Sequence, residues 1–222
     1  MTSINNFSPN MLKTYDECSQ KFFFRYVQKL SVPQRAAIFE KGKKIHALAN
    51  YYLKGEDIAK MENSLNVDES AAWEALKSSK YFDLNVVNTE YNLSSKIGKY
   101  WVGGRLDAFM GNDKSDYFIL DYKTGNIPKN AEQDFQTIVY LLCADKFLKK
   151  KGGYNSLEFV YIGLKNDEEK EISLTDDLKK QYEEKIVSTC EKINFALKSN
   201  VFAKNQDACK FCEYNKICGG QS

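Results

Sequence analysis

The chain has 222 residues, of which 43% are hydrophobic and 28% charged, with 3 prolines and 12 glycines. These proportions are typical of a packed globular protein and exclude low-complexity disorder, and no stretch is apolar enough to span a bilayer. The 32 basic and 30 acidic residues leave a net charge of +2, which says nothing about partners.

The first 85 residues are predicted to form a helical region. Ser8 followed by Pro9 is typical of a helix start, and apolar residues recur at helical spacing after it. We expect three helices, over 8–30, 34–54 and 68–79. Residues 1–60 hold ten Lys and Arg against five Asp and Glu, which suits a polyanion but also suits an ordinary solvated surface.

The hydrophobic period changes after residue 85, where strands begin. We expect strands over 86–93, 100–110 and 117–123, a helix over 131–150, strands over 157–164 and 171–174, and a helix over 176–199. Thr175 is the predicted N-cap of that last helix, and 201–222 should be irregular. The order α, β, β, β, α, β predicts an α/β fold with a mixed sheet flanked by helices. We expect one domain over 1–222, with 1–85 helical, 86–175 the sheet core, and 176–222 a long helix and tail.

Two neighbouring predicted strands carry a possible metal site. Asp121 and Lys123 lie two apart on one strand and should share a face. A turn near Lys114 would place Asp107 opposite Asp121. Two carboxylates at that distance resist joint ionisation unless a cation such as Mg²⁺ or Mn²⁺ lies between them. A surface salt bridge between strands is the alternative.

Four further residues are candidates for this site. His46, the single histidine, could supply a nitrogen ligand, although a lone histidine is usually structural. Glu90 is another acid, on a face that the sequence does not define. Gln136 and Tyr140 are one helical turn apart and could contact a phosphate or orient the lysine, or could form an ordinary helix face.

The six cysteines fall into two groups. Cys143 and Cys190 lie inside apolar helices and are expected in the core. Cys209, Cys212 and Cys218 are close together in the tail and need a fourth ligand. The choices are Cys18, Cys143, Cys190 and His46, and Cys18 could meet the tail in space. Zinc and an iron–sulfur cluster both remain open on spacing. The N-terminus lacks a signal sequence, so a reducing cytoplasmic location is expected, where such cysteines hold a metal more often than they form disulfides.

Together these motifs resemble the RecB-like branch of the PD-(D/E)XK nucleases. They are most similar to its iron–sulfur sub-branch, which includes CRISPR spacer-acquisition exonucleases and AddB-type repair nucleases. The resemblance covers nearly the whole chain. It rests on 8–18, His46, 104–107, 121–123, 136–140 and the three tail cysteines.

The resemblance implies a restriction-endonuclease-like core and specific residue roles. His46, Asp107, Asp121 and the carbonyl of Tyr122 would bind catalytic Mg²⁺ or Mn²⁺. Lys123 would position the water, and Gln136 and Tyr140 would complete the site. A [4Fe–4S] cluster on the cysteines at positions 18, 209, 212 and 218 would join the chain ends, with zinc the less favoured occupant. Ser19 replaces a common proline and Asp121 a common glutamate, but neither change removes a ligand.

The expected function is therefore a metal-dependent DNA nuclease, an exonuclease on single-stranded ends that uses a metal-activated water. Its role would be in DNA repair, recombination or CRISPR spacer acquisition. Because the chain has no phosphate-loop motif, unwinding would come from a helicase partner, or CRISPR adaptation proteins would be the partners. No membrane contact is expected. The alternative is a non-catalytic module, stapled by zinc or a cluster, that binds nucleic acid.

Overall fold

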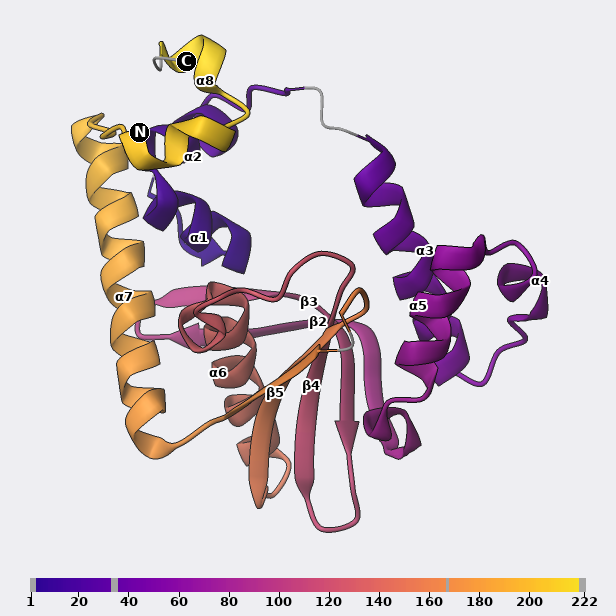
Figure 1. The fold of residues 1–222 in the computed structure, drawn as a ribbon. Coiled ribbons are helices and arrows are strands. Elements are labelled where there is room, and N and C mark those ends of the chain that lie inside the picture. The colour runs from indigo at the N-terminus through magenta and orange to yellow at the C-terminus, as the bar shows by residue number, and fades with distance from the viewer. Residues whose placement is uncertain (1–2, 33–35, 167, 220–222) are drawn as a thin grey trace.

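A computed structural model of the chain describes residues 3–32, 36–166 and 168–219. In these residues one mixed sheet forms the centre of the molecule (Figure 1). Strands β2, β3 and β4 are antiparallel, β5 runs parallel to β4, and β6 and the short β1 lie at the two sides. The strands are β1 (Asn6–Phe7), β2 (Asn85–Ile97), β3 (Tyr100–Gly111), β4 (Asp116–Lys123), β5 (Ser156–Gly163) and β6 (Glu168–Ser173).

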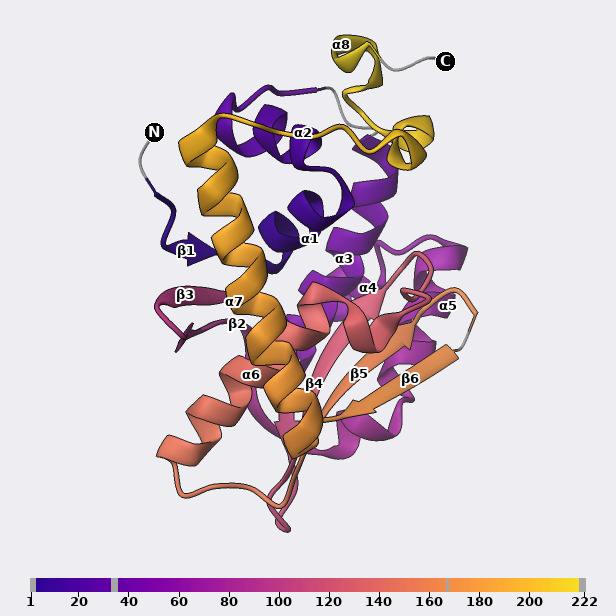
Figure 2. The same ribbon diagram turned by 90° about the vertical axis from the view of Figure 1, so that its left-hand side faces the viewer.

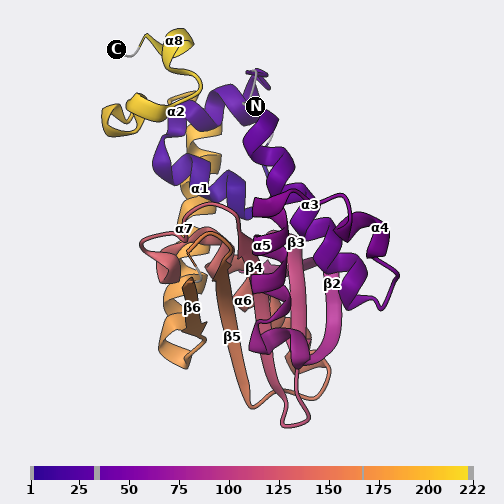
Figure 3. The ribbon, with the colours of Figure 1, turned by 45° about the vertical axis from the view of Figure 1, so that its right-hand side comes forward.

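Helices cover both faces of this sheet. Helices α6 and α7 pack on one side, and α3 and α5 lie on the other (Figures 1 and 3). The helices are α1 (Pro9–Glu17), α2 (Ser19–Phe22), α3 (Ala36–Leu53), α4 (Ala59–Glu62), α5 (Val67–Lys77), α6 (Phe135–Lys150), α7 (Asp176–Ser199) and α8 (Asn215–Cys218). This arrangement confirms the predicted fold class of a mixed sheet flanked by helices.

The core has two hydrophobic clusters, one on each face of the sheet. Neighbouring residues of β4 show the division, because Ile119 packs into the cluster under α6 while Leu120 packs with Trp73 of α5. All three side chains are almost completely buried. Burial on both faces explains why β4 reads as a continuous apolar run, as central strands do. The expected core thiols Cys143 and Cys190 are both fully buried in the first cluster.

Side-chain caps define where the predicted helices begin. The Ser8 hydroxyl accepts a hydrogen bond from the Met11 amide at 3.2 Å, with Pro9 in the first turn. Thr175 caps α7 through the Leu178 amide at 3.2 Å, and α7 has the predicted bounds Asp176–Ser199. None of the helices described by the structure is both long and apolar enough to cross a bilayer.

The predicted continuous helix over 8–30 is wrong, because the chain breaks at Cys18. This residue is extended (φ −166°, ψ 113°), and α2 and a π-helical turn (Phe23–Val27) follow it. The break turns the Gln20 amide toward the carbonyl of Ala203, 3.1 Å away. Contacts with the distant C-terminal tail thus replace a continuous helix.

Several other predicted boundaries differ. The helix predicted over 131–150 starts with a 3₁₀ turn (Ala131–Gln133), and the α-helix begins after Asp134, which caps it. Strand β2 continues to Ile97, while two-residue β1 was not expected. The tail contains a 3₁₀ turn (Gln206–Phe211) and α8. The first two residues of the helix expected over 34–54 lie outside the described residues.

The C-terminal tail lies beside the first helices above the sheet, as the views in Figures 1 and 2 agree. The Asn205 side-chain amide donates to the Glu17 carbonyl at 2.8 Å, and the Tyr214 hydroxyl donates to the Leu30 carbonyl at 2.9 Å. The cysteine tail is therefore held against the first helices.

Candidate active site

The sheet register brings Asp107 and Asp121 together. The paired register ends at Ala108 and Leu120, and Asp107 and Asp121 are the next residues on the two strands, near each other as the sequence-based pairing expected. Asp107 is fixed in place because its Oδ2 accepts the backbone N–H of Tyr122 at 2.9 Å. The end of the β3–β4 ladder is thus the centre of the candidate site.

His46 reaches this point from α3. Its Nδ1 lies 3.1 Å from Asp107 Oδ1, and its Nε2 lies 3.0 Å from the carbonyl oxygen of Tyr122. Burial lowers the pKa of His46, but the hydrogen bond to Asp107 and the charges of Asp107 and Asp121 outweigh this effect and raise it. Both neighbouring atoms are acceptors, so the site is built around a positive charge.

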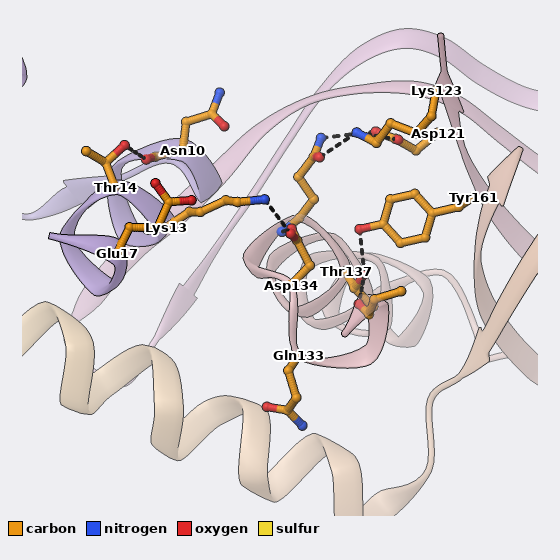
Figure 4. A network of polar contacts seen from close by, with 12 residues as sticks. Asn10, Lys13, Thr14, Glu17, Asp121, Lys123, Gln133, Asp134, Thr137 and Tyr161 are labelled. Atoms are coloured by element: carbon orange, nitrogen blue, oxygen red, sulfur yellow. Dashed lines mark hydrogen bonds and ion pairs between the residues drawn. The ribbon is translucent and has the colours of Figure 1, made fainter. Parts of the chain in front are cut away.

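Lys123, Asp121 and Gln136 form a closed polar triangle (Figure 4). Lys123 Nζ lies 2.7 Å from Asp121 Oδ2 and donates to Gln136 Oε1 at 2.8 Å. Gln136 Nε2 donates to Asp121 Oδ1 at 3.0 Å. Each side chain is held by the other two, which fixes the ammonium beside the carboxylate, as expected for Asp121 and Lys123 on one strand face.

Burial is the main influence on Asp121, which is only 6% exposed. The pKa of the Asp121 carboxyl is raised to about 6. Burial is the largest cause; the charge of Lys123 opposes it, and the charge of Asp107 adds to it. A second carboxylate so near therefore makes ionisation of Asp121 costly. A cation beside the two acids would offset that cost.

Two residues outside the predicted set fix the position of Gln136: Asp134 contacts it directly, and Lys13 contacts Asp134. Asp134 Oδ1 accepts the Gln136 backbone N–H at 2.9 Å, and Asp134 Oδ2 lies 2.6 Å from Lys13 Nζ of α1 (Figure 4). Asp directly before an apolar helical run is an N-cap signal, so Asp134 could have been recognised in the sequence. Its partner Lys13 on α1 could not have been recognised, because the two residues are far apart in sequence.

Tyr161 lies under the lysine. Lys123 Nζ is 5.5 Å from the centre of the Tyr161 ring, within the range of a cation–π contact. The Tyr161 hydroxyl is 3.0 Å from Thr137 Oγ1, and both residues are fully buried. The buried ring therefore supports the Lys123 ammonium on one side. Sequence spacing did not indicate this contact.

Tyr140 lies apart from the triangle formed by Lys123, Asp121 and Gln136. Its hydroxyl donates to the carbonyl oxygen of Arg105 at 2.9 Å. A Cβ atom on Gly104 would lie 2.9 Å from this hydroxyl, so the missing side chain at 104 makes room for it. Tyr140 thus braces β3 two residues before Asp107, and the structure gives it no direct contact with Lys123.

Glu90 lies close to His46 and Asp107, and the three side chains are of types that can bind a metal ion. One ligand atom from each lies within 4.8 Å of the others, and Asp121 stands outside this trio among the described residues. Glu90 has a left-handed backbone (φ 47°), uncommon for a residue other than glycine, and its Oε2 lies 2.8 Å from Arg105 Nε. The sequence could not define its face because this irregularity interrupts the alternation of β2.

The donor set suits a hard divalent cation. It offers carboxylate oxygens, a backbone carbonyl and one imidazole beside an open hollow of about 620 Å³. The buried Oδ2 of Asp121 accepts no well-formed hydrogen bond from the described residues, despite its ionic contact with Lys123. A bound cation would satisfy it.

The family comparison agrees with this geometry. Residues 6–219 match the model of the PD-(D/E)XK nuclease superfamily. The chain belongs to that superfamily. Within it, the mixed sheet with paired acids and a lysine at its edge supports a hydrolytic nuclease.

A solved structure of another protein shows the same fold as this nuclease. A proposed exonuclease from Eubacterium rectale superimposes with a TM-score of 0.60 at 7% identity, covering 96% of this chain and 88% of that one. A protein called SSO0001 aligns with a TM-score of 0.49 at 16% identity, covering 100% of this chain and 90% of the other. None of the curated proteins matches the nuclease.

The four predicted cluster cysteines of this nuclease line one cavity, together with Lys21 and Tyr214. These are Cys18, Cys209, Cys212 and Cys218. The cavity is narrow, about 10 Å³, which is room for about one water molecule. No three of the four sulfurs lie within 4.8 Å of one another, since the one such trio in the described chain is the His46 group. Four thiolates around zinc are about 3.8 Å apart, given Zn–S bonds of about 2.3 Å.

Proposed function

We propose that this nuclease is a divalent-metal-dependent deoxyribonuclease that hydrolyses phosphodiester bonds, acting as an exonuclease on single-stranded ends. The observation that carries the proposal is the Lys123 ammonium, held by Asp121 and Gln136 beside the acids of the β3–β4 ladder. The exonuclease name of the Eubacterium rectale protein, whose fold this chain shares, favours the same activity.

The proposed roles follow from the contacts. His46, Asp107, Asp121 and the Tyr122 carbonyl would hold Mg²⁺ or Mn²⁺, with Glu90 completing the acidic wall. When bound, such an ion polarises the phosphodiester and lowers the pKa of a coordinated water.

Lys123 has the charge and position to orient the attacking water and to offset negative charge on the phosphate. Gln136 keeps the lysine rotamer fixed, and the Tyr161 ring supports it from below. Tyr140 contributes by holding β3 through Arg105. Pre-organisation of this kind reduces the reorganisation that the transition state would otherwise require.

The nucleolytic test compares linear single-stranded DNA, circular single-stranded DNA and RNA with Mg²⁺ and Mn²⁺ varied. Linear DNA should be degraded from its ends while circles persist. Lys123→Ala and Asp121→Asn should lower the rate by at least about a hundredfold, the scale of losing one electrostatic donor. Lys170→Ala is the matched control, since Lys170 donates to the Lys129 carbonyl on the surface. Equal rates in all variants would place the activity elsewhere, and no cleavage by the wild type would favour a binding module.

We propose further that the nuclease belongs to the RecB-like branch and carries a [4Fe–4S] cluster on the four clustered cysteines. The lining of one cavity by all four cysteines supports a shared metal centre, and the resemblance to the iron–sulfur sub-branch favours a cluster over zinc. The cavity of about 10 Å³ would have to widen to hold a cluster. The loop closed from Cys18 to Cys209 spans about 190 residues, and closure cost grows only slowly with length.

Iron content tests the cluster. Protein purified without oxygen should be brown and contain iron and acid-labile sulfide. Cys209→Ala should lose iron, whereas Cys190→Ala should keep it, because Cys190 lies in the core away from the tail. Stoichiometric zinc without iron would contradict the cluster and assign a structural zinc site to these cysteines. The proposed setting is the cytoplasm, in DNA repair, recombination or CRISPR spacer acquisition, with a helicase or adaptation protein as partner.

A further inference from the structure

One face of the β2–β3 hairpin forms an exposed strip that starts at the candidate active site. Side chains on a strand alternate between faces, and buried residues such as Leu93, Val102 and Leu106 point into the core. Their neighbours point the other way. The strip consists of Asn92, Ser94 and Lys96 on β2 and Trp101, Gly103 and Arg105 on β3.

The strand register orders these residues in three cross-strand pairs. Asn92 lies opposite Arg105, Ser94 opposite Gly103, and Lys96 opposite Trp101. Asp107 is six positions along β3 from Trp101, which is about 20 Å at the rise of a β-strand. In Figure 2 these paired ends of β2 and β3 project to the left past α7.

Two hollows lie along the strip. The first, about 620 Å³, includes His46, Glu90 and Asp107 and ends at Arg105. The second, about 610 Å³, includes Ser94, Gly103 and Trp101. Gly103 has no side chain, and a Cβ there would lie 2.4 Å from the Leu93 carbonyl oxygen, so the hollow cannot be filled by substitution without moving the hairpin.

The chemistry of the strip matches one strand of nucleic acid. Lys96 brings positive charge for phosphates, and so does the exposed guanidinium of Arg105, whose Nε also pairs with Glu90. Asn92 and Ser94 bring short hydrogen-bonding groups. Trp101 is 50% exposed at the far end, a large aromatic surface with no core function. An aromatic ring stacks on an unpaired base, whereas a base inside a duplex is already stacked on its neighbours.

We propose that this strip binds the single-stranded DNA that extends from the scissile phosphate, with Trp101 stacking on a base about 20 Å from Asp107. The proposal rests on the proposed nuclease function and adds a substrate path to it. Arg105 links the two parts, because it lines the catalytic hollow and faces Asn92 of the strip. The β2–β3 face thereby selects single strands over duplexes.

Intrinsic fluorescence gives a test that does not depend on cleavage. The chain has two tryptophans, of which Trp73 is 1% exposed and Trp101 is 50% exposed. An oligothymidylate added with EDTA, and therefore without hydrolysis, should quench the emission of Trp101. Trp101→Phe keeps a ring for stacking, so it should bind the strand while showing no quenching. A duplex of equal length should quench much less.

Affinity measured by anisotropy under the same conditions gives the magnitude. Trp101→Ala should raise Kd roughly five- to a hundredfold, the range for removing one base–aromatic stack. This loss should grow with strand length until the strand spans the strip. Phe195→Ala is the matched control, because Phe195 is an exposed aromatic (72%) on α7. Circular dichroism of each variant checks that the hairpin is folded.

Salt dependence tests the phosphate contact at Lys96. Lys96→Ala should lower the slope of log Kd against log salt by about 0.7, the value for one contact to a single strand. Lys80→Ala, whose ammonium pairs with Glu171 at 2.8 Å, should leave the slope unchanged.

The outcomes separate the two proposals. Quenching that persists in Trp101→Phe, equal Kd for Trp101→Ala and the wild type, or equal quenching by duplex and single strand would each overturn the strip. Quenching as described in a protein that never cleaves DNA would support the strip and contradict the proposed hydrolysis. Cleavage without quenching would support the proposed hydrolysis and contradict the strip.

Discussion

His46 Nδ1 lies 3.1 Å from Asp107 Oδ1, although the two residues come from α3 and β3 on opposite sides of a long stretch of sequence. The contact joins the helix that covers one face of the sheet to the strand at its centre. It makes the helix position, and not only the sheet, part of the candidate metal site.

The first prediction concerns metal affinity. His46→Ala removes the imidazole that touches both Asp107 and the Tyr122 carbonyl. We expect the Mn²⁺ concentration for half-maximal binding to rise at least about tenfold, since even outer-shell partners of a metal cost this much. Isothermal titration calorimetry with Mn²⁺ and no DNA measures it.

Lys44→Ala is the control for this change. Lys44 lies on the same helix but pairs with Glu69 of α5 at 3.2 Å. Its Mn²⁺ affinity should equal that of the wild type. If His46→Ala also binds Mn²⁺ normally, the histidine holds the fold and not the ion.

The second prediction separates two glutamines near one helix start. Gln136→Ala leaves Lys123 and Asp121 without the amide that holds them, so kcat should fall about ten- to a hundredfold with little change in DNA affinity. Gln133→Ala should keep kcat, because Gln133 is exposed and contacts only Lys185 of α7 among the described side chains.

Steady-state kinetics on linear single-stranded DNA measure both glutamine variants. Gln136→Glu is a useful third variant, since it keeps the size of the side chain but places a carboxylate against Asp121. A larger loss than in Gln136→Ala is expected. Equal kcat for Gln136→Ala and Gln133→Ala would show that Lys123 needs no positioning.

The third prediction tests the contact between Gly104 and Tyr140. Gly104→Ala places a Cβ atom 2.9 Å from the Tyr140 hydroxyl and 3.4 Å from Pro9. We expect the free energy of unfolding to fall by about 1–3 kcal/mol, the usual cost of overpacking. Urea denaturation measures this change.

Gly125→Ala is the control for Gly104→Ala, because no atom lies within 4 Å of the added methyl group there. The double variant with Tyr140→Phe should recover part of the loss, since the phenolic oxygen that clashes is removed. Additive losses in the double variant would mean that the two residues do not interact.

The fourth prediction concerns pH and Asp145, which is 1% exposed inside α6. Lys179 and Lys149 lie 2.6 and 2.8 Å from its carboxylate, and the Tyr154 hydroxyl donates to it at 2.7 Å. Burial raises the pKa of Asp145, but these three hydrogen-bonding groups outweigh burial and lower it below its usual value. The ionised form therefore stabilises the folded state.

The lowered pKa of Asp145 sets the direction in which stability changes with pH. The stabilisation is complete above the unfolded pKa of about 4 and is lost as pH falls through the lower folded value. Asp145→Asn should cost about 1–3 kcal/mol at pH 7 and much less near pH 2. Urea midpoints at the two pH values measure it. Asp113→Asn, on the exposed β3–β4 turn, should show no such difference. A pH-independent loss in Asp145→Asn would assign it to packing alone.

Local patterns were enough for much of the fold. Thr175 and the acids after it mark the start of α7, and the alternation after residue 85 marks the central strands. The same alternation, with a short turn, paired Asp107 with Asp121 and placed Lys123 beside Asp121. These features depend on neighbours along the chain or across one hairpin, so spacing alone can predict them.

Other features depend on partners that are distant in sequence. Cys18 breaks its helix where α2 meets the tail, and Asp134 is held by Lys13 of α1. Glu90 reaches the trio through a left-handed backbone that interrupts strand alternation. Tyr140 shares a helix face with Gln136 yet contacts a different strand. No periodicity records such contacts.

Composition and spacing by themselves determined the α/β class, the central acids and lysine, and the division of six cysteines into core and tail. Only the tertiary structure decided that the hollow at His46 continues onto an exposed hairpin face ending at Trp101, and that four cysteines from both chain ends line one cavity. The physical reason is that helix capping, helical periodicity and strand alternation depend on residues near one another in sequence, whereas a site needs side chains from several elements at one point in space.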